Sequence, residues 1–168
     1  MVRRKADDTL KKDIEEILIE IQDATNQKMK EFNTSLFIEK RKPPTLRLYK
    51  YNSYTFFTSD DGGTGTNYKG MILYDLATLF LTELPAIAHD SLLFKNVDDE
   101  SISGIMRIYN QTAKMNKQVF IAFDKQGSYG KGTKEIIENN VVIKLSDNGG
   151  ELYGMSWNKE NKNIEDKL

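Results

Sequence analysis

Carboxylates stand at the ends of two apolar runs in the middle of the chain. Asp90 follows residues 86–88 and His89, and Asp124 follows residues 119–123. Continuous apolar runs are typical of parallel strands buried on both faces, and open α/β sheets bind ligands beyond the carboxyl ends of such strands. A carboxylate in that place can hold Mg²⁺ through water while the metal neutralises phosphate oxygens. The pair therefore predicts phosphate chemistry at one edge of a sheet.

A glycine-rich segment, residues 59–66, precedes these runs. Its glycines allow backbone conformations that other residues avoid, and its Asp and Thr side chains can cap a following helix. Successive N–H groups at a helix N-terminus attract an anion, so the segment fits either a phosphate-binding loop or an ordinary turn. It is not a Walker A motif, because Lys69 is followed by Gly70 and no glycine stands directly before it.

Two further polar residues in apolar surroundings call for a structural explanation. His89 is the only histidine of the chain, and a single histidine inside a core is more often hydrogen-bonded there than a ligand. Asp75 lies in an otherwise apolar helix, where a carboxylate must be paired or hydrogen-bonded. We expect each of them to have a structural partner.

Composition sets the limits for function. The 168 residues suit one domain, and 24 basic against 25 acidic residues give a net charge of −1, which provides no whole-chain argument for a nucleic-acid or membrane surface. There is no cysteine and one histidine, which excludes disulfides, thiolate chemistry and a His-rich zinc site. Neither a secretory leader nor an apolar run of membrane-spanning length is found, so we expect a soluble, cytoplasmic protein without a membrane partner.

The elements that must position these residues follow from the apolar pattern. A helix is expected over residues 8–32, and then a proline-closed linker at residues 39–44, in which consecutive cations fit either a solvated segment or a phosphate contact. An antiparallel hairpin is expected from residues 45–51 and 54–58. The helix carries a short apolar seam of coiled-coil spacing, although a surface helix docked on its own domain is equally consistent with it. The seam consists of Leu10, Ile14, Ile17, Ile21 and Ala24.

The second part of the chain predicts a strand–helix–strand unit. A nearly all-apolar helix at residues 66–83 is followed by the strand that ends at Asp90, a helix capped by the acidic residues 98–100, and the strand that ends at Asp124. Right-handed connection of parallel strands places both aspartates at the same edge. Further on we expect a helix at residues 133–140, a hairpin around residues 147–150, Trp157 in the core, and a disordered or weakly helical tail.

Together these features resemble the C-terminal half of an ABC-type ATPase head of the SMC and RecN kind. More closely, they resemble an uncharacterised bacterial family that carries this half at the end of a coiled-coil ATPase. The motifs are a signature-like loop at Gly63-Thr64-Gly65-Thr66, a Walker B-like strand ending at Asp90, a D-loop-like segment at residues 96–98, and a switch-like strand ending at Asp124. The resemblance implies an α/β lobe with a largely parallel sheet flanked by helices. It divides the chain into a coiled-coil arm (residues 1–32), the lobe (33–157) and a polar tail (158–168).

The resemblance also implies roles for individual residues. Gly63, Thr64, Gly65 and Thr66, with Lys69 beyond them, would contact the γ-phosphate of ATP held by an opposing head, and Asp90 would hold Mg²⁺. Ser91 stands where the family has a catalytic Glu, and Asp124 stands where it has a switch His, so the water-activating group would be Asp98, Asp99 or Asp124, or hydrolysis would be slow or absent. Because no Walker A motif occurs, ATP and Mg²⁺ are expected only in a head completed by an N-terminal Walker A half and a second head.

Three functions are compatible with these residues. The first is a lobe of a coiled-coil ATPase acting in DNA maintenance or in defence against foreign DNA, as the resemblance implies, with DNA as a possible partner. The second is a self-sufficient Mg²⁺-dependent phosphoryl-transfer enzyme or nuclease built on Asp90, Asp98 or Asp99, and Asp124. The third is a catalytically dead interaction module in which the acidic residues only cap helices. The apolar seam favours the first.

Overall fold

The structure is a computed structural model that describes residues 2–36, 41–50, 52–123, 129–146 and 150–154. The chain divides into two compact units, Met1–Ile136 and Ile137–Leu168, which are treated separately. Its elements are helices with one antiparallel and one parallel pair of strands, so the predicted mixed α/β class is confirmed. Among the described residues no helix has both the length and the apolar character needed to cross a membrane.

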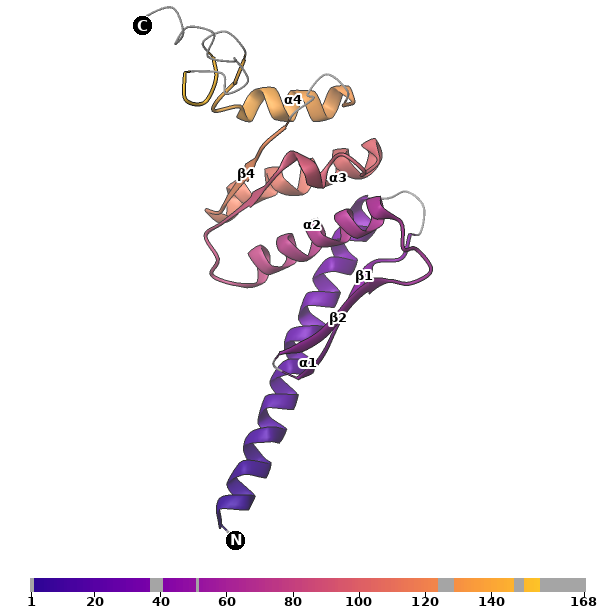
Figure 1. The fold of residues 1–168 in the computed structure, drawn as a ribbon, viewed down its shortest axis with the longest axis vertical. Coiled ribbons are helices and arrows are strands. Elements are labelled where there is room, and N and C mark those ends of the chain that lie inside the picture. Colours follow the sequence, from indigo (N-terminus) through magenta and orange to yellow (C-terminus); the bar gives the residue numbers. More distant parts are fainter. Residues whose placement is uncertain (1, 37–40, 51, 124–128, 147–149, 155–168) are drawn as a thin grey trace, which may run out of the picture. The chain divides into compact units, whose positions relative to one another are not determined.

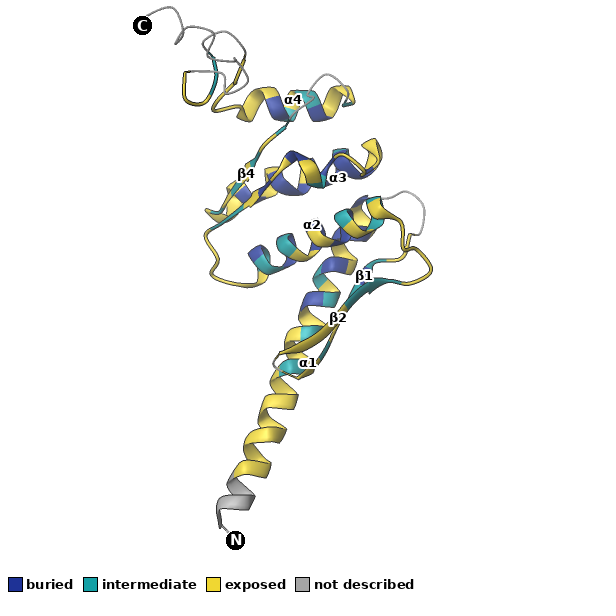
Figure 2. Cartoon of the chain, viewed as in Figure 1, coloured by how far each residue is buried: buried dark blue, intermediate teal, exposed yellow. Residues whose placement is uncertain are grey.

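Helix α1 (Val2–Leu36) starts earlier and ends later than predicted, and its two halves differ (Figures 1 and 2). In the C-terminal half Met29, Phe32 and Leu36 are buried, and the Phe32 ring meets Phe80 edge-on with centroids 5.1 Å apart. In the N-terminal half the apolar seam is exposed, with Leu10 at 59% and Ile17 at 54%. The coiled-coil interpretation of this seam stays a prediction.

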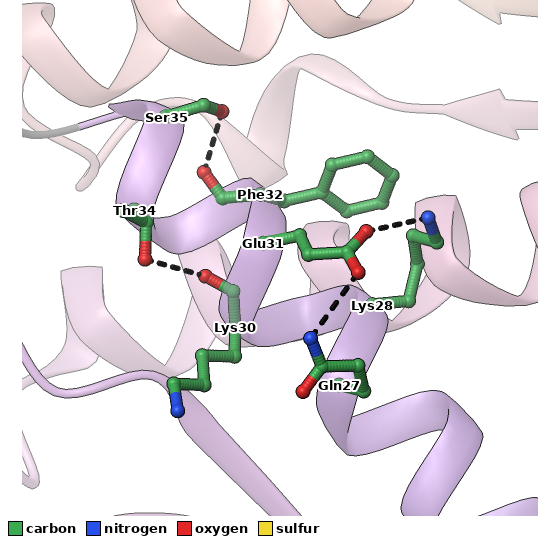
Figure 3. Close-up of polar contacts among 7 residues, drawn as sticks. All are labelled: Gln27, Lys28, Lys30, Glu31, Phe32, Thr34 and Ser35. Atoms are coloured by element: carbon green, nitrogen blue, oxygen red, sulfur yellow. Dashed lines mark hydrogen bonds and ion pairs between the residues drawn. The ribbon is translucent and has the colours of Figure 1, made fainter.

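Polar side chains stabilise the last turns of α1 (Figure 3). Glu31 accepts hydrogen bonds from Lys28 at 2.6 Å and from Gln27 at 3.3 Å, and these two bonds lower the pKa of its carboxyl. The Thr34 and Ser35 hydroxyls donate to the carbonyls of Lys30 and Phe32. The charged residues face outward here, so the apolar face of the same turns is free to pack against the domain.

The predicted hairpin is confirmed and lies alongside α1 (Figure 1). Strands β1 (Pro44–Lys50) and β2 (Ser53–Thr58) pair antiparallel, with an irregularity between Leu48 and Lys50. Two amides of α1 reach the β1 backbone. The side chain of Asn26 accepts from the N–H of Leu46 at 2.8 Å and donates to its carbonyl at 2.9 Å, and Gln22 accepts from the N–H of Leu48 at 3.0 Å.

Helix α2 (Thr64–Leu81) begins two residues before the predicted start. Ile72, Leu73, Leu76 and Leu79 are fully buried, but Met71 is 48% exposed and Leu81 is 44% exposed. The apolar sequence predicts a helix covered on both sides, and this prediction is wrong for the outer face of α2. After α2 the chain forms β3 (Ala86–His89), the short 3₁₀ helix η1 (Ser91–Leu93), α3 (Asp99–Thr112), the 3₁₀ helix η2 (Ala113–Met115) and β4 (Gln118–Ile121).

Strands β3 and β4 are parallel, and Ala86 pairs with Gln118 through to His89 with Ile121. The strand–helix–strand unit is therefore confirmed. The predicted sheet differs in extent, because the described strands form two separate pairs rather than one largely parallel sheet. The prediction that both strands are buried on both faces is wrong for this chain, since Ala88 and Phe120 are exposed. The described residues thus cover only one face of the parallel pair.

The last described elements correct a second prediction. Helix α4 (Lys131–Asn140) agrees closely with the predicted helix. The expected hairpin reduces to one antiparallel bridge between Ser146 and Gly150, and Val142 in the preceding segment is 93% exposed. An isolated two-stranded hairpin without a packed face is only marginally stable, which explains why the alternating sequence does not suffice. Trp157 and the tail lie outside the described residues.

Candidate functional site

The glycine loop carries an internal carboxylate at the start of α2. Gly63 precedes the helix in an extended conformation and lacks a side-chain cap of its own. Instead, Asp61 accepts from the N–H of Gly63 at 3.1 Å and from the Thr66 hydroxyl at 2.7 Å. These two bonds, led by that from Thr66, hold the pKa of Asp61 below its ordinary value. One N–H and one hydroxyl of the predicted phosphate loop therefore each bind one oxygen of the same carboxylate.

Gly65 brings this loop against the segment that precedes α3. A Cβ built on Gly65 would lie 2.2 Å from the carbonyl oxygen of Asn96 and 3.2 Å from its carbon. No side chain larger than hydrogen fits this approach, so the glycine is needed for packing. The structure thus joins the signature-like loop to the D-loop-like segment, two motifs that lie about thirty residues apart in the sequence.

Asp98 caps α3 with both of its carboxylate oxygens. One oxygen accepts from the N–H of Ser101 at 2.9 Å, and the other accepts from the Ser101 hydroxyl at 2.7 Å and pairs with Arg41 at 3.3 Å. Burial alone would raise the pKa of Asp98, but the bonds from Ser101 and the charge of Arg41 outweigh it and lower the pKa. The predicted acidic cap is confirmed, and its ion pair with Arg41 was not foreseen.

Lys69 lies between these two helix starts and is only 4% exposed. Burial lowers the pKa of its ammonium, and the positive charge of Arg41 adds to this, whereas Asp61 and Asp98 act in the opposite direction. We refer to Arg41, Asp61, Thr66, Lys69 and Asp98 as the cap cluster. It combines two cations, two carboxylates and two helix N-termini, which is an environment that favours anions. Lys42, next to Arg41, is ion-paired with Asp60.

Asp90 and Ser91 lie at the carboxyl end of β3, as predicted. Asp90 is exposed, and one oxygen of its carboxylate accepts from the Ser91 hydroxyl at 3.1 Å. The N–H of Ala122, just beyond β4, donates to the His89 carbonyl at 3.0 Å, so both strands end at this edge. Asp124 lies outside the described residues, and its place beside Asp90 stays a prediction.

His89, which is buried, and Asp75, which is partly exposed, are hydrogen-bonded to one another. His89 is 4% exposed, its Nε2 lies 3.1 Å from Asp75, and its Nδ1 lies 2.6 Å from the Tyr109 hydroxyl. Because a carboxylate only accepts, Nε2 donates to Asp75, and Nδ1 accepts from the Tyr109 hydroxyl whenever the ring carries a single proton. Burial and then the charge of Asp75 raise the pKa of Tyr109 well above its ordinary value, so the hydroxyl keeps its proton. Both expectations of a structural partner are confirmed.

The fit to Mg²⁺ and phosphate follows from these contacts. Within the described ranges, no three His, Asp or Glu side chains gather in a way that could hold a metal ion. The exposed Asp90 carboxylate fits a metal held through water, provided that other oxygens complete its shell. Asp61 acts as a stand-in anion, which shows that the loop donors fit a negatively charged oxygen. A phosphate group could use these donors only after the exposed Asp61 side chain had turned away.

Sequence reasoning missed three contributors to this arrangement. The sequence indicates Arg41 only as one cation of a linker and Asn96 only as part of a motif, and it gives Tyr109 no separate role. Tyrosine on a buried face beside a core histidine is a usable signal, because a buried hydroxyl needs a partner. The other two contacts join distant segments and leave no local pattern.

Comparisons with known proteins give a family and a fold. The sequence matches the family described as "uncharacterised protein conserved in bacteria" (DUF2326) over residues 16–157. No curated protein matches it. Among solved structures, one from work on ATP-driven dimerization and DNA-stimulated activation of SMC ATPases is similar, with a TM-score of 0.57 and 12% identity over 80% of this chain and 84% of that chain. At this identity the likeness concerns the fold.

Proposed function

The chain belongs to the bacterial DUF2326 family, and on that premise we propose that it is the C-terminal lobe of an SMC-like ATPase head. The likeness in fold to an SMC ATPase supports the architecture. The observation that carries the proposal is the stand-in carboxylate of Asp61, because it marks the loop donors as an anion-binding arrangement. The head acts in DNA maintenance or in defence against foreign DNA.

Two partners complete the proposed head. A segment or chain with a Walker A motif supplies the primary phosphate contacts, since none occurs in this sequence. A second head brings its nucleotide to the loop of this one. There Gly63, Thr64, Gly65 and Thr66 would offer N–H and hydroxyl donors to the γ-phosphate. Lys69 would add positive charge from within the cap cluster.

Asp90 would hold Mg²⁺ through water at the end of β3. The ion supplies charge neutralisation of the phosphate oxygens when it is bound. Ser91 offers a hydroxyl rather than a carboxylate at the position of the catalytic Glu, and in this structure it donates to Asp90. Proton transfer by Asp98 would require it to leave the α3 cap, because both its oxygens accept hydrogen bonds there. Asp99 and Asp124 are then the remaining acidic candidates for activating water.

The test is ATP hydrolysis by the assembled head, with this chain joined to the Walker A segment encoded by the same or a neighbouring gene. Asp90→Asn should lower Mg²⁺ affinity or turnover by about ten- to a hundredfold, the range found when groups that orient a metal through its outer shell are lost. Asp13→Asn removes the same charge from an exposed site on α1 and should change neither quantity.

Two outcomes would contradict the proposal. One is an assembled head whose hydrolysis is indifferent to Asp90→Asn. The other is metal-dependent hydrolysis of ATP or nucleic acid by this chain alone, which would favour the self-sufficient enzyme instead. An assembled head that binds ATP without hydrolysing it would agree with the proposed lobe, and it would place Ser91 as the reason for slow chemistry.

A further inference from the structure

Three hydrogen-bonded side chains, which we call the relay, join three elements next to Asp90. Asp75 comes from α2, His89 is the last residue of β3, and Tyr109 lies in α3. The two hydrogen bonds of the imidazole measure 3.1 and 2.6 Å. Both ring nitrogens are therefore satisfied, and the ring is held between two helices that pack on the strand.

Burying the His89 ring costs free energy of desolvation, which its two hydrogen bonds must offset. The neighbouring buried residues of α2 and α3, such as Leu76 and Ile105, are apolar. An apolar side chain at the position of His89 would bury without the need for partners, whereas a histidine there needs both of its own. A fully satisfied polar network does, however, select one arrangement of its elements in a way that apolar contacts do not.

The relay fixes the position of the backbone at Asp90. The His89 side chain is fixed by the relay, and its carbonyl accepts from the N–H of Ala122 at 3.0 Å. The next carbonyl, that of Asp90, accepts from the N–H of Leu93 at 3.1 Å and starts η1. The chain is therefore held on both sides of the bond at which it leaves the sheet, and the Asp90 carboxylate projects from a fixed point.

We propose that Asp75, His89 and Tyr109 are positioning residues that fix the end of β3 so that the Asp90 carboxylate meets its metal in one geometry. The role of the metal rests on the proposed function, whereas the fixing of the backbone does not. Asp75 is the outer member of the relay, with 43% of its side chain exposed, and Tyr109 is the inner member, with 6% of the residue exposed. Changes at either end should therefore reach Asp90 through His89.

The first experiment uses this chain alone and follows the single histidine by nitrogen-15 NMR at pH 8. The spectrum should show the neutral ring protonated at Nε2, and Tyr109→Phe should shift the Nδ1 resonance. Amide exchange then reports on the backbone. Tyr109→Phe and Asp75→Ala should speed exchange at Leu93 and Ala122 by about five- to tenfold more than at Leu46, which lies in the hairpin.

Two variants serve as controls. Tyr74→Phe removes the same hydroxyl from a partly exposed ring that contacts Phe56, and it should leave exchange at Leu93 and Ala122 unchanged. Asp75→Asn retains an oxygen that can accept from Nε2, so it should restore most of the protection lost in Asp75→Ala. Equal acceleration at Leu46, Leu93 and Ala122 would show a general loss of stability and would overturn the proposal.

The second experiment uses the assembled head. Tyr109→Phe should raise the Mg²⁺ concentration for half-maximal ATP hydrolysis by about three- to tenfold and leave kcat at saturating Mg²⁺ nearly unchanged. A lower kcat with an unchanged Mg²⁺ requirement would overturn the positioning role. A head that neither binds nor hydrolyses ATP would count against the proposed function. In any head without hydrolysis, the amide exchange at Leu93 and Ala122 decides the inference alone.

Discussion

Helices α2 and α3 start side by side, and they are capped in opposite ways. The start of α3 has its own cap, Asp98, with Asp99 and Glu100 in the first turn. The start of α2 follows a glycine without a side-chain cap and depends on Asp61 from the preceding loop. Both aspartates lie at exposed positions, and Asp98 has in addition an ion pair with Arg41.

The difference shows which of the two starts can exchange its anion. The Asp98 cap is part of its own helix, holds three hydrogen bonds or ion pairs, and is needed for α3 to begin where it does. The Asp61 carboxylate comes from the loop before α2 and holds two hydrogen bonds, so we expect that an external anion could replace it without unfolding the helix. We therefore expect the start of α3 to keep its own carboxylate and the start of α2 to be the one that binds an external anion.

The largest effect should come from separating the two starts. Gly65→Ala places a methyl group 2.2 Å from the Asn96 carbonyl, and overpacking of this kind costs about 1–3 kcal/mol of unfolding free energy. Gly62→Ala, whose added carbon would meet nothing within 4 Å, is the matched control and should stay within about 0.5 kcal/mol of the parent. Urea unfolding of both variants measures the difference, and equal stability would show that the two starts are not in contact.

A smaller effect should appear at Asp98 as a pH dependence. Asn caps a helix about as well as Asp, so Asp98→Asn removes mainly the charge and should cost about 0.3–1 kcal/mol at pH 7. The pKa of Asp98 is lowered in the folded chain, so its stabilising contribution is present above the ordinary carboxyl pKa, about 3.9, and is lost as pH falls through the folded value.

The thermal midpoints of the parent and of Asp98→Asn should therefore differ at pH 7 and converge as the pH falls below about 4. Asp99→Asn, at an exposed position in the first turn of the same helix, provides the comparison. A gap that persisted unchanged into acid would mean that the Asp98 charge is not what stabilises the start of α3.

The smallest effect on stability should come from Asp61→Asn. The amide oxygen can still accept from the Gly63 N–H, and the amide nitrogen can donate to the Thr66 hydroxyl in place of the second carboxylate oxygen. The side chain is also exposed, so the unfolding midpoint should not move measurably. Removal of the competing charge should instead tighten the binding of ATP to the assembled head several-fold. Weaker binding would show that Asp61 supports the nucleotide rather than standing in for it.

Local patterns predicted the parts of the molecule that local chemistry determines. The acidic residues 98–100 predicted the α3 cap, the apolar run after Lys117 predicted β4, and the place of Asp75 in an otherwise apolar helix predicted a partner for it. In each case the sequence carries a cost that only one kind of structure offsets, such as unpaired N–H groups or a buried charge.

Contacts between distant segments were not predictable in the same way. Nothing in the sequence around Gly65 indicates the Asn96 carbonyl, because the close approach depends on how α2 and the segment before α3 cross. The expected pairing after α4 failed for a related reason. An alternating pattern specifies a strand only where another element covers one face, and Val142 is 93% exposed.

The amides of Gln22 and Asn26 have a mechanical consequence for α1. They occupy the backbone groups of β1 that a neighbouring strand would otherwise take, so they protect this edge from pairing with other chains. They also fix the rotation of α1 about its own axis relative to β1. A turn of α1 by one residue, about 100°, would carry both amides off the strand and leave the N–H groups of Leu46 and Leu48 unpaired. A rotation imposed on the exposed half of α1 should therefore turn the hairpin with it, because α1 cannot rotate against β1 without breaking these hydrogen bonds.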